Sequence, residues 1–341
     1  MVHYHIPLDI RINSNLLECH MKILLHGPIT LGPIDKLKKL LAFPCQIKTY
    51  NTCFTDQHFL KDLSMADVLV TMELPDFVLF PSQLKLIQIT GVGVNHIDFS
   101  KIPKHIPICV TPGHEEAIVE YILMTMLIFL RNLKQVEESF KKHSWEMGAC
   151  CGGHLQNQLA NKKIGILGYG KIGQNIAKQL KPFGVKNYVC NRTPVQGKGI
   201  DKFFNLQDLN KMLKEVDFLI VSLALTPETQ NIINKRSFEL MKSQMIIINV
   251  ARGPCIDEKA LFDACKEKKI KGAVLDVWYK YPTGGASFQS SSQYPFESLD
   301  NVIMTPHISA WTEETMDKKI KIIATNIKRI ASGKPLLNLS R

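Results

Sequence analysis

The sequence predicts an α/β protein with two domains, each built on a doubly wound parallel sheet. The first observation is the length: at roughly 100–200 residues per domain, 341 residues suggest two domains that can each bury a core. The second is the alternation of short apolar runs with amphipathic stretches, which is typical of parallel strands joined by crossover helices. The third is the composition, with 45% hydrophobic residues and a mean hydropathy of −0.01, which is ordinary for a globular protein.

The first series of elements begins near Met21. Apolar runs predict buried strands at residues 22–26, 67–71 and 86–90, and helical spacing of apolar residues predicts a helix at 35–41. A glycine-rich turn, Gly91-Val92-Gly93, follows the last of these strands. Residues 1–20 lack the basic flank, the apolar core and the cleavage site of a secretory signal. Because the first expected strand starts near Met21, we interpret them as a short extension.

A second and longer series begins after Gly113. Its expected helices are 116–130, 171–182, 258–268 and, near the C-terminus, 313–330. Its expected strands are 163–167, 187–190, 218–222, 245–249, 272–276 and 302–304. Strands that alternate with helices in this way indicate a doubly wound sheet. We expect the final helix to return to the first domain.

Charge and cysteine content bear on partners and compartment. The net charge of +11, from 42 Lys and Arg against 31 Asp and Glu, could attract a polyanion. The lysines are scattered over helix-like stretches, however, which favours solvated helix faces over a nucleic-acid site. Nine cysteines without a CxxC pair favour reduced thiols in a cytoplasmic protein. The longest apolar run, Ile118 to Leu130, is too short for a membrane span and contains Glu120. We expect no metal.

A dinucleotide fingerprint, Gly168-Tyr169-Gly170-Lys171-Ile172-Gly173, follows the strand at 163–167 and opens a helix. Gly168 permits the tight turn, Gly170 lets the backbone approach a pyrophosphate, and Gly173 lets helix and strand pack closely. The helix N-terminus then presents unpaired N–H groups to the anion. The alternative is a plain strand–turn–helix joint, but the position of the motif between strand and helix favours a bound dinucleotide.

The end of the next strand bears on the choice between NAD and NADP. An NAD enzyme usually has Asp or Glu there, which accepts from the ribose hydroxyls and repels a 2′-phosphate. This strand ends at Asn191, which carries no charge, and Arg192 supplies a planar cation suited to phosphate. Thr193 can add a hydroxyl donor. We therefore predict NADP(H), with NAD(H) as the alternative if Arg192 is only a solvated loop residue.

Polar residues follow three strands of the second series at their carboxyl ends, the edge that carries the site in open α/β sheets. Arg252 follows the strand at 245–249, and its guanidinium matches a carboxylate. Asp276 ends the next strand, and His307 follows the last one after a proline and suits an acid–base role. Each alone could be a surface arginine, a turn cap or a core histidine. Together, after a dinucleotide fingerprint, they predict hydride transfer at a 2-oxo or 2-hydroxy acid.

This ordered set of motifs resembles the D-isomer-specific 2-hydroxyacid dehydrogenase family from about Met21 to the C-terminus. The matching segments are 91–98, 168–173, 225–229, 249–253, Asp276-Val277 and Pro306-His307. The resemblance implies a Rossmann cofactor domain at residues 114–307, inserted in a flavodoxin-like substrate-binding domain at 1–113 and 308–341. It also implies a homodimer formed through the cofactor domains, to which the helix at 116–130 contributes.

The resemblance implies roles for single residues. Arg252 would hold the substrate carboxylate and oxo oxygen, and His307 would protonate that oxygen. Backbone N–H groups near Val92 and Gly93 would bind the carboxylate from the smaller domain, and Asp276 would face the nicotinamide carboxamide. The other cofactor contacts would come from Gly168, Gly170, Lys171, Ile172, Gly173, Asn191, Arg192, Thr193, Leu223, Thr229, Val250 and Ala251. The segment 191–193 resembles that of NADPH-preferring glyoxylate and hydroxypyruvate reductases.

One position departs from the family pattern. The family normally has Glu beside the histidine, five residues after the Asp of the Asp-Val motif, where this chain has Tyr281. A carboxylate would raise the pKa of the imidazolium, whereas a tyrosine can orient the ring without that charge. We therefore expect a lower pKa for His307, and a reduction optimum at more acidic pH, than in a relative with Glu.

Two other functions stay open. Formate dehydrogenases of the same family also lack that Glu, which leaves formate or phosphite oxidation as an alternative. Against it, His114 replaces the asparagine with which those enzymes hold formate. A dinucleotide-sensing protein of the corepressor kind is the other alternative, because the missing Glu and the basic surface allow it. Arg252 and His307 both remain, however, and favour a reductase of a small 2-oxo acid.

Overall fold

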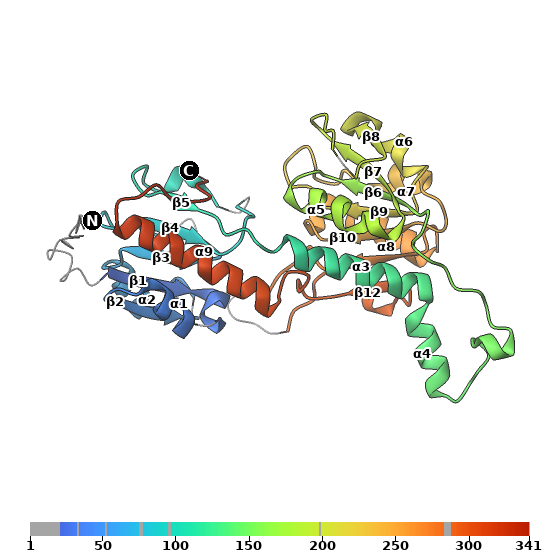
Figure 1. Cartoon of the computed structure of the whole chain (residues 1–341), viewed down its shortest axis with the longest axis horizontal. Helices are drawn as coiled ribbons and strands as arrows, with labels where there is room; N and C mark the ends of the chain where they lie inside the picture. The colour runs from blue at the N-terminus through green and yellow to red at the C-terminus, as the bar shows by residue number, and fades with distance from the viewer. Residues whose placement is uncertain are drawn as a thin grey trace, which may run out of the picture. The chain divides into compact units, whose positions relative to one another are not determined.

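The computed structural model describes residues 21–340 apart from 33, 52, 75–77, 95–96, 198 and 283–287. The predicted extension at 1–20 and part of the 91–98 motif therefore lie outside the described residues. The chain divides into two compact units, Met1–Thr111 with Asp317–Arg341, and Pro112–Met316 (Figure 1). Each unit is built on a parallel sheet, which confirms the predicted fold class.

The unit boundaries differ from the expected ones, which were 113/114 and 307/308. The structure places them at Thr111/Pro112 and Met316/Asp317. The second difference has a clear physical cause. The backbone N–H groups of Ile308 and Ser309 donate to the carboxylate of Asp276 at 2.7 and 2.8 Å. These bonds hold the segment after His307 in the larger unit, so the chain leaves that unit later than expected.

The first unit contains a five-stranded sheet of order β2-β1-β3-β4-β5, the flavodoxin-like order. Its strands are β1 (Met21–His26), β2 (Cys45–Tyr50), β3 (Val68–Thr71), β4 (Leu86–Ile89) and β5 (Ile108–Cys109). Its helices are α1 (Ile34–Leu41), α2 (Gln57–Leu63) and most of α9 (Glu313–Ala331). The final helix returns to this unit as expected, and Asn326 of α9 donates a buried hydrogen bond of 2.8 Å to Gln88 of β4.

The second unit contains a seven-stranded sheet of order β12-β11-β10-β9-β6-β7-β8, which is the Rossmann order with an added strand. Its strands are β6 (Lys163–Leu167), β7 (Lys186–Asn191), β8 (Lys202–Asn205), β9 (Phe218–Val221), β10 (Ile246–Asn249), β11 (Gly272–Leu275) and β12 (Val302–Met304). Its helices are α3 (Glu115–Arg131), α4 (Leu133–Lys141), α5 (Lys171–Leu180), α6 (Leu209–Leu213), α7 (Lys235–Leu240) and α8 (Glu258–Lys266).

Apolar runs become strands here because helices cover both faces of the sheet. In the second unit, α3 and α5 bury Ile122 and Ile176 on one face, and α6 and α8 bury Leu213 and Leu261 on the other. In the first unit, α2 packs on the sheet through Phe59. Within the described part of the chain, no helix combines the length and apolar character that crossing a membrane requires.

Candidate active site

The glycine-rich turn joins β6 to α5 where the strand order of the second sheet reverses. Gly168 has a φ of +97°, and a Cβ there would lie 2.8 Å from the backbone of Leu223. A Cβ on Gly173 would lie 2.2 Å from the carbonyl oxygen of Gly168. A Cβ on Gly170, in contrast, would meet nothing within 4 Å. The outer glycines therefore close the turn, and the middle one leaves open space where a ligand can approach the backbone.

The N-terminus of α5 can hold an anion. Gly170 at the N-cap offers no side-chain hydrogen bond, and the first turn contains no acidic residue. The first backbone N–H groups of the helix, which include those of Lys171 and Ile172, have no partner within the helix. The helix dipole also favours negative charge there. These groups fit the pyrophosphate of a nicotinamide dinucleotide.

The segment after β7 supports the glycine-rich turn. Asn191 accepts a hydrogen bond of 3.3 Å from the backbone of that turn and donates one of 2.9 Å to the carbonyl of Thr193. Arg192 is exposed. The pKa of Glu228 is lowered by the Thr226 hydroxyl and further by the charge of Arg192, which places Arg192 within electrostatic reach of that loop. The arginine thus lies near two loops that the sequence assigned to the cofactor.

The other residues predicted to contact the cofactor lie in loops at the carboxyl ends of β9 and β10. Thr229 closes its loop with two hydrogen bonds of 2.7 Å, one donated to a carbonyl and one accepted from a backbone N–H. Leu223 faces Gly168. Val250 and Ala251 directly follow β10 and are almost fully buried. The contacts of all four residues with a cofactor remain predictions.

Arg252 is presented by a rigid turn after β10. The buried side chain of Asn249 accepts from the N–H of Ala251 at 3.1 Å and donates to the carbonyl of Arg252 at 3.0 Å. A Cβ on Gly253 would lie 2.4 Å from the carbonyl oxygen of Trp278, so only glycine allows this close approach. The guanidinium donates from Nη1 to Ala251 O at 2.7 Å. No carboxylate among the described residues forms an ion pair with the guanidinium, so its paired N–H donors can bind an anion.

His307 lies in a turn after β12 that Asp276 holds. Asp276 is fully buried, and its oxygens accept from the hydroxyl of Thr305 at 2.6 Å and from the N–H groups of Ile308 and Ser309. His307 adopts a φ of +60°, which is uncommon outside glycine. The role of Asp276 toward the nicotinamide remains a prediction. Both oxygens of Asp276 already accept hydrogen bonds from the turn that contains His307.

Tyr281 contacts His307. Its hydroxyl lies 3.0 Å from Nδ1 and accepts from the N–H of Trp278 at 3.3 Å. The hydroxyl can donate to Nδ1 of a neutral ring, which then carries its hydrogen on Nε2, and it can accept from Nδ1–H of the imidazolium. Burial raises the pKa of the phenol. The hydrogen bond from the backbone of Trp278 and the charge of Arg252 lower it by less, so the phenol stays neutral. Arg252, Tyr281 and His307 follow β10, β11 and β12, and these parallel strands end at one edge of the sheet.

Val92 and Gly93 lie in the other unit, in the turn that follows β4. Val92 is exposed, and residues 95–96 of the same motif lie outside the described part. His114 precedes α3 and is buried. The turn after β4 is at the carboxyl edge of its sheet, which is the edge where open α/β sheets bind ligands.

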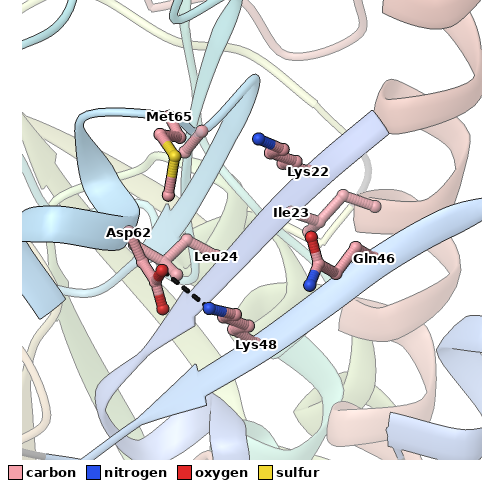
Figure 2. Close-up of a pocket in the computed structure, with 8 residues that line it drawn as sticks. Lys22, Ile23, Leu24, Gln46, Lys48, Asp62 and Met65 are labelled. Atoms are coloured by element: carbon pink, nitrogen blue, oxygen red, sulfur yellow. Dashed lines mark hydrogen bonds and ion pairs between the residues drawn. The ribbon is translucent and has the colours of Figure 1, made fainter. Parts of the chain in front are cut away.

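A hollow in the first unit does not belong to this edge. It lies beside β1, β2 and α2 (Figure 2) and has a volume of about 30 Å³, which suits about one water molecule. Lys48 and Asp62 form an ion pair of 2.7 Å there, and Tyr50 also hydrogen-bonds to Asp62. Because these polar groups satisfy one another, the hollow is explained by packing around a structural ion pair.

Three residues near the histidine turn were not predicted from the sequence. Thr305 and Trp278 directly adjoin recognised motifs and could have been found through them. Tyr121 could not, because it contacts Thr305 across 184 residues of sequence and carries no local signal of that contact.

The fold and these residues define a two-domain α/β protein with a Rossmann dinucleotide-binding domain. Residues 123–309 match the family model described as "D-isomer specific 2-hydroxyacid dehydrogenase, NAD binding domain". The chain belongs to the D-isomer specific 2-hydroxyacid dehydrogenase family, as its motifs implied.

Named relatives agree with this membership. The chain is 34% identical to hydroxypyruvate reductase of Thermotoga maritima over 83% of this chain and 90% of that protein. It is also 34% identical to D-3-phosphoglycerate dehydrogenase of Methanocaldococcus jannaschii over 83% of this chain, but it spans only about half of that protein, 53%. Among solved structures it is similar to an NADPH-dependent glyoxylate/hydroxypyruvate reductase from Sinorhizobium meliloti in complex with NADP and malonate. The identity is 25%, the TM-score is 0.74, and 94% of this chain and 96% of that chain are covered.

Proposed function

We propose that the protein is an oxidoreductase that transfers a hydride between NADP(H) and a small 2-oxo or D-2-hydroxy acid of the glyoxylate or hydroxypyruvate type. The observation that carries this proposal is the grouping of Arg252, Tyr281 and His307 in the unit that also holds the open turn at Gly170. Family membership and the names of the Thermotoga and Sinorhizobium relatives support it.

Each residue has a defined task in this reaction. A bound nicotinamide dinucleotide would supply or accept the hydride. The guanidinium of Arg252 would bind the substrate carboxylate and the oxo oxygen. In its imidazolium form His307 would donate the Nε2 proton to the oxo oxygen during reduction and become a neutral imidazole. Tyr281 would orient the imidazole through Nδ1.

A panel of substrates tests the proposal, and turnover is measured from the change in absorbance of NADPH or NADH. We expect reduction of glyoxylate or hydroxypyruvate with NADPH, while pyruvate and phenylpyruvate probe larger side chains. Formate and phosphite are assayed in the oxidative direction, and turnover of one of these alone would replace the proposal. Tight cofactor binding without turnover of any substrate would instead favour the dinucleotide-sensing alternative.

The cofactor preference depends on Arg192. Arg192→Ala is expected to raise the KM for NADPH about 10- to 100-fold, because hydrogen bonds to charged groups contribute roughly 1.5–3 kcal/mol. The KM for NADH should change little, since NADH has no 2′-phosphate. Initial rates at varied cofactor concentration give both values, and the exposed arginine of α7, in Arg236→Ala, is the control. Equal losses with the two cofactors would contradict an Arg192–phosphate contact.

The pH dependence of the reduction rate tests the effect of having Tyr281 where the family normally has Glu. Tyr281→Glu is expected to shift the alkaline limb of the reduction rate to higher pH, by about one unit or more. A carboxylate stabilises the imidazolium and raises its pKa, so His307 keeps its proton to higher pH. In the unmodified protein the phenol has a raised pKa and contributes no negative charge in the neutral range.

The matched control for this shift is Tyr281→Phe. It removes the hydroxyl without adding charge, so we expect a lower kcat and no upward shift of the profile. A Tyr281→Glu profile that is unchanged or displaced toward acid would show that position 281 does not act electrostatically on His307.

We also propose a homodimer formed through the second unit. α4 buries none of its residues and leads away from the seven-stranded sheet (Figure 1). Apolar side chains are exposed along α3, α4 and the loop that follows, at Met124, Leu133, Phe140, Trp145 and Leu155. Apolar surface of this kind is typical of an interface. A cytoplasmic location is part of the proposal, on the ground of the nine cysteines without a disulfide framework.

Light scattering on a sizing column tests the dimer. The expected mass is twice the 38.6 kDa of one chain, and Phe140→Asp should shift the protein toward the monomer because it places a charge in the apolar surface. A monomeric unmodified protein would contradict the dimer.

A further inference from the structure

A chain of polar groups connects α3 to the turn that carries the histidine. The hydroxyl of Tyr121 lies 2.6 Å from Oγ1 of Thr305, and this Oγ1 lies 2.6 Å from Oδ1 of Asp276. Tyr121 is 7% exposed and Asp276 is 0% exposed, so water cannot readily replace either group. All three residues belong to the second unit.

The chemistry of these groups sets the direction of both bonds. Asp276 accepts three hydrogen bonds, from Thr305 and from two backbone N–H groups, and therefore acts as a carboxylate. Thr305 donates its single hydroxyl hydrogen to this carboxylate, so its oxygen must accept from the hydroxyl of Tyr121. The phenol can donate because burial raises the pKa of Tyr121 to about 12. We call this chain of two hydrogen bonds, from Tyr121 to Thr305 and from Thr305 to Asp276, the relay.

The relay ends on the backbone of the histidine turn. Asp276 accepts from the N–H groups of Ile308 and Ser309, the two residues that follow His307. The φ of +60° at His307 belongs to a conformation that persists only where the surroundings hold it. The orientation of the imidazole therefore depends on the orientation of the carboxylate.

We propose that Tyr121 is a positioning residue for His307. It acts through Thr305 and Asp276, and the proposal rests on the acid–base function proposed for the histidine. Without the phenol hydroxyl, the Oγ1 of the half-buried Thr305 loses its donor and the threonine can rotate away from the carboxylate. The imidazole then occupies more orientations, and fewer substrate complexes have the proton in line with the oxo oxygen. The carboxylate contact assigned to Arg252 does not use this relay.

Steady-state kinetics of Tyr121→Phe test the relay. We expect kcat for reduction to fall about tenfold while KM changes less than about twofold. The control is Tyr188→Phe, which removes the hydroxyl of another buried tyrosine of the same unit whose described contacts come from its ring. Thr305→Ser keeps the hydroxyl and should be faster than Thr305→Val, which has the same shape without it. An unchanged kcat in Tyr121→Phe, or a loss confined to KM, would overturn the proposal.

Hydrogen exchange provides a readout that does not need activity. In peptides that cover 303–311, the N–H groups of Ile308 and Ser309 should exchange faster in Tyr121→Phe than in the unmodified protein, and at an unchanged rate in Tyr188→Phe. If Tyr121→Phe does not fold, Thr305→Val provides the same measurement. Faster exchange in a protein that reduces no 2-oxo acid would support the relay and reject the proposed function. Unchanged exchange would overturn the relay, whatever the activity.

Discussion

Replacing His307 with glutamine is expected to lower kcat for reduction of the 2-oxo acid by about 10²- to 10⁴-fold, the range typical of a general acid. Glutamine is polar and of similar length, but it cannot give up a proton at neutral pH. The KM should change little, because the substrate carboxylate is assigned to Arg252. Initial rates with saturating NADPH measure both parameters.

The control for this substitution is His105→Gln. His105 is an exposed histidine of the first unit that contacts the carbonyl of Ser82 at 3.2 Å. Its removal should leave kcat close to that of the unmodified protein. A His307→Gln enzyme that retains more than a tenth of the kcat would mean that another group delivers the proton.

Replacing Arg252 with lysine is expected to lower kcat/KM by about 10²- to 10³-fold, mainly through KM. Lysine keeps the positive charge but cannot form two parallel hydrogen bonds with a carboxylate, and loss of one partner of such a charged pair costs roughly 2–5 kcal/mol. The turn itself should persist, because the side chain of Asn249 holds it through backbone atoms. Initial rates at varied 2-oxo acid concentration measure the loss.

The control is Arg236→Lys, an exposed conservative change on α7, which should leave kcat/KM unchanged. If Arg252→Lys lowered kcat alone and left KM unchanged, the guanidinium would have to act on the reacting oxygen and not on the bound carboxylate.

Much of the fold could be predicted because its strands are buried on both faces. β9 is apolar throughout and β10 is apolar up to Asn249, and both were expected close to their observed bounds. Elements without such a run were missed. β2 has side chains that are exposed or half-buried along its length, and α4 buries no residue, so neither has the apolar pattern by which a single sequence indicates structure.

The candidate site was predictable to the extent that it follows strand ends. Arg252 and His307 were found because each comes shortly after an apolar run that ends a predicted strand, and parallel strands end at one edge. Tyr281 was expected to orient the imidazole, and its hydroxyl lies 3.0 Å from Nδ1. The hydrogen bonds from Thr305, Ile308 and Ser309 to Asp276 were not predicted. These donors follow β12, and the sequence does not show which backbone N–H groups lack a partner within the secondary structure.

The amino-acid sequence alone determined the dinucleotide turn, the parallel sheets and the residue types at their carboxyl ends, since glycine conformation and apolar periodicity act between neighbours in the chain. Only the tertiary structure decided that the larger unit extends to Met316 and that Tyr121 reaches Thr305. The physical reason is that a hydrogen bond between distant segments depends on how helices pack on a sheet, and such packing leaves no periodic trace around either partner.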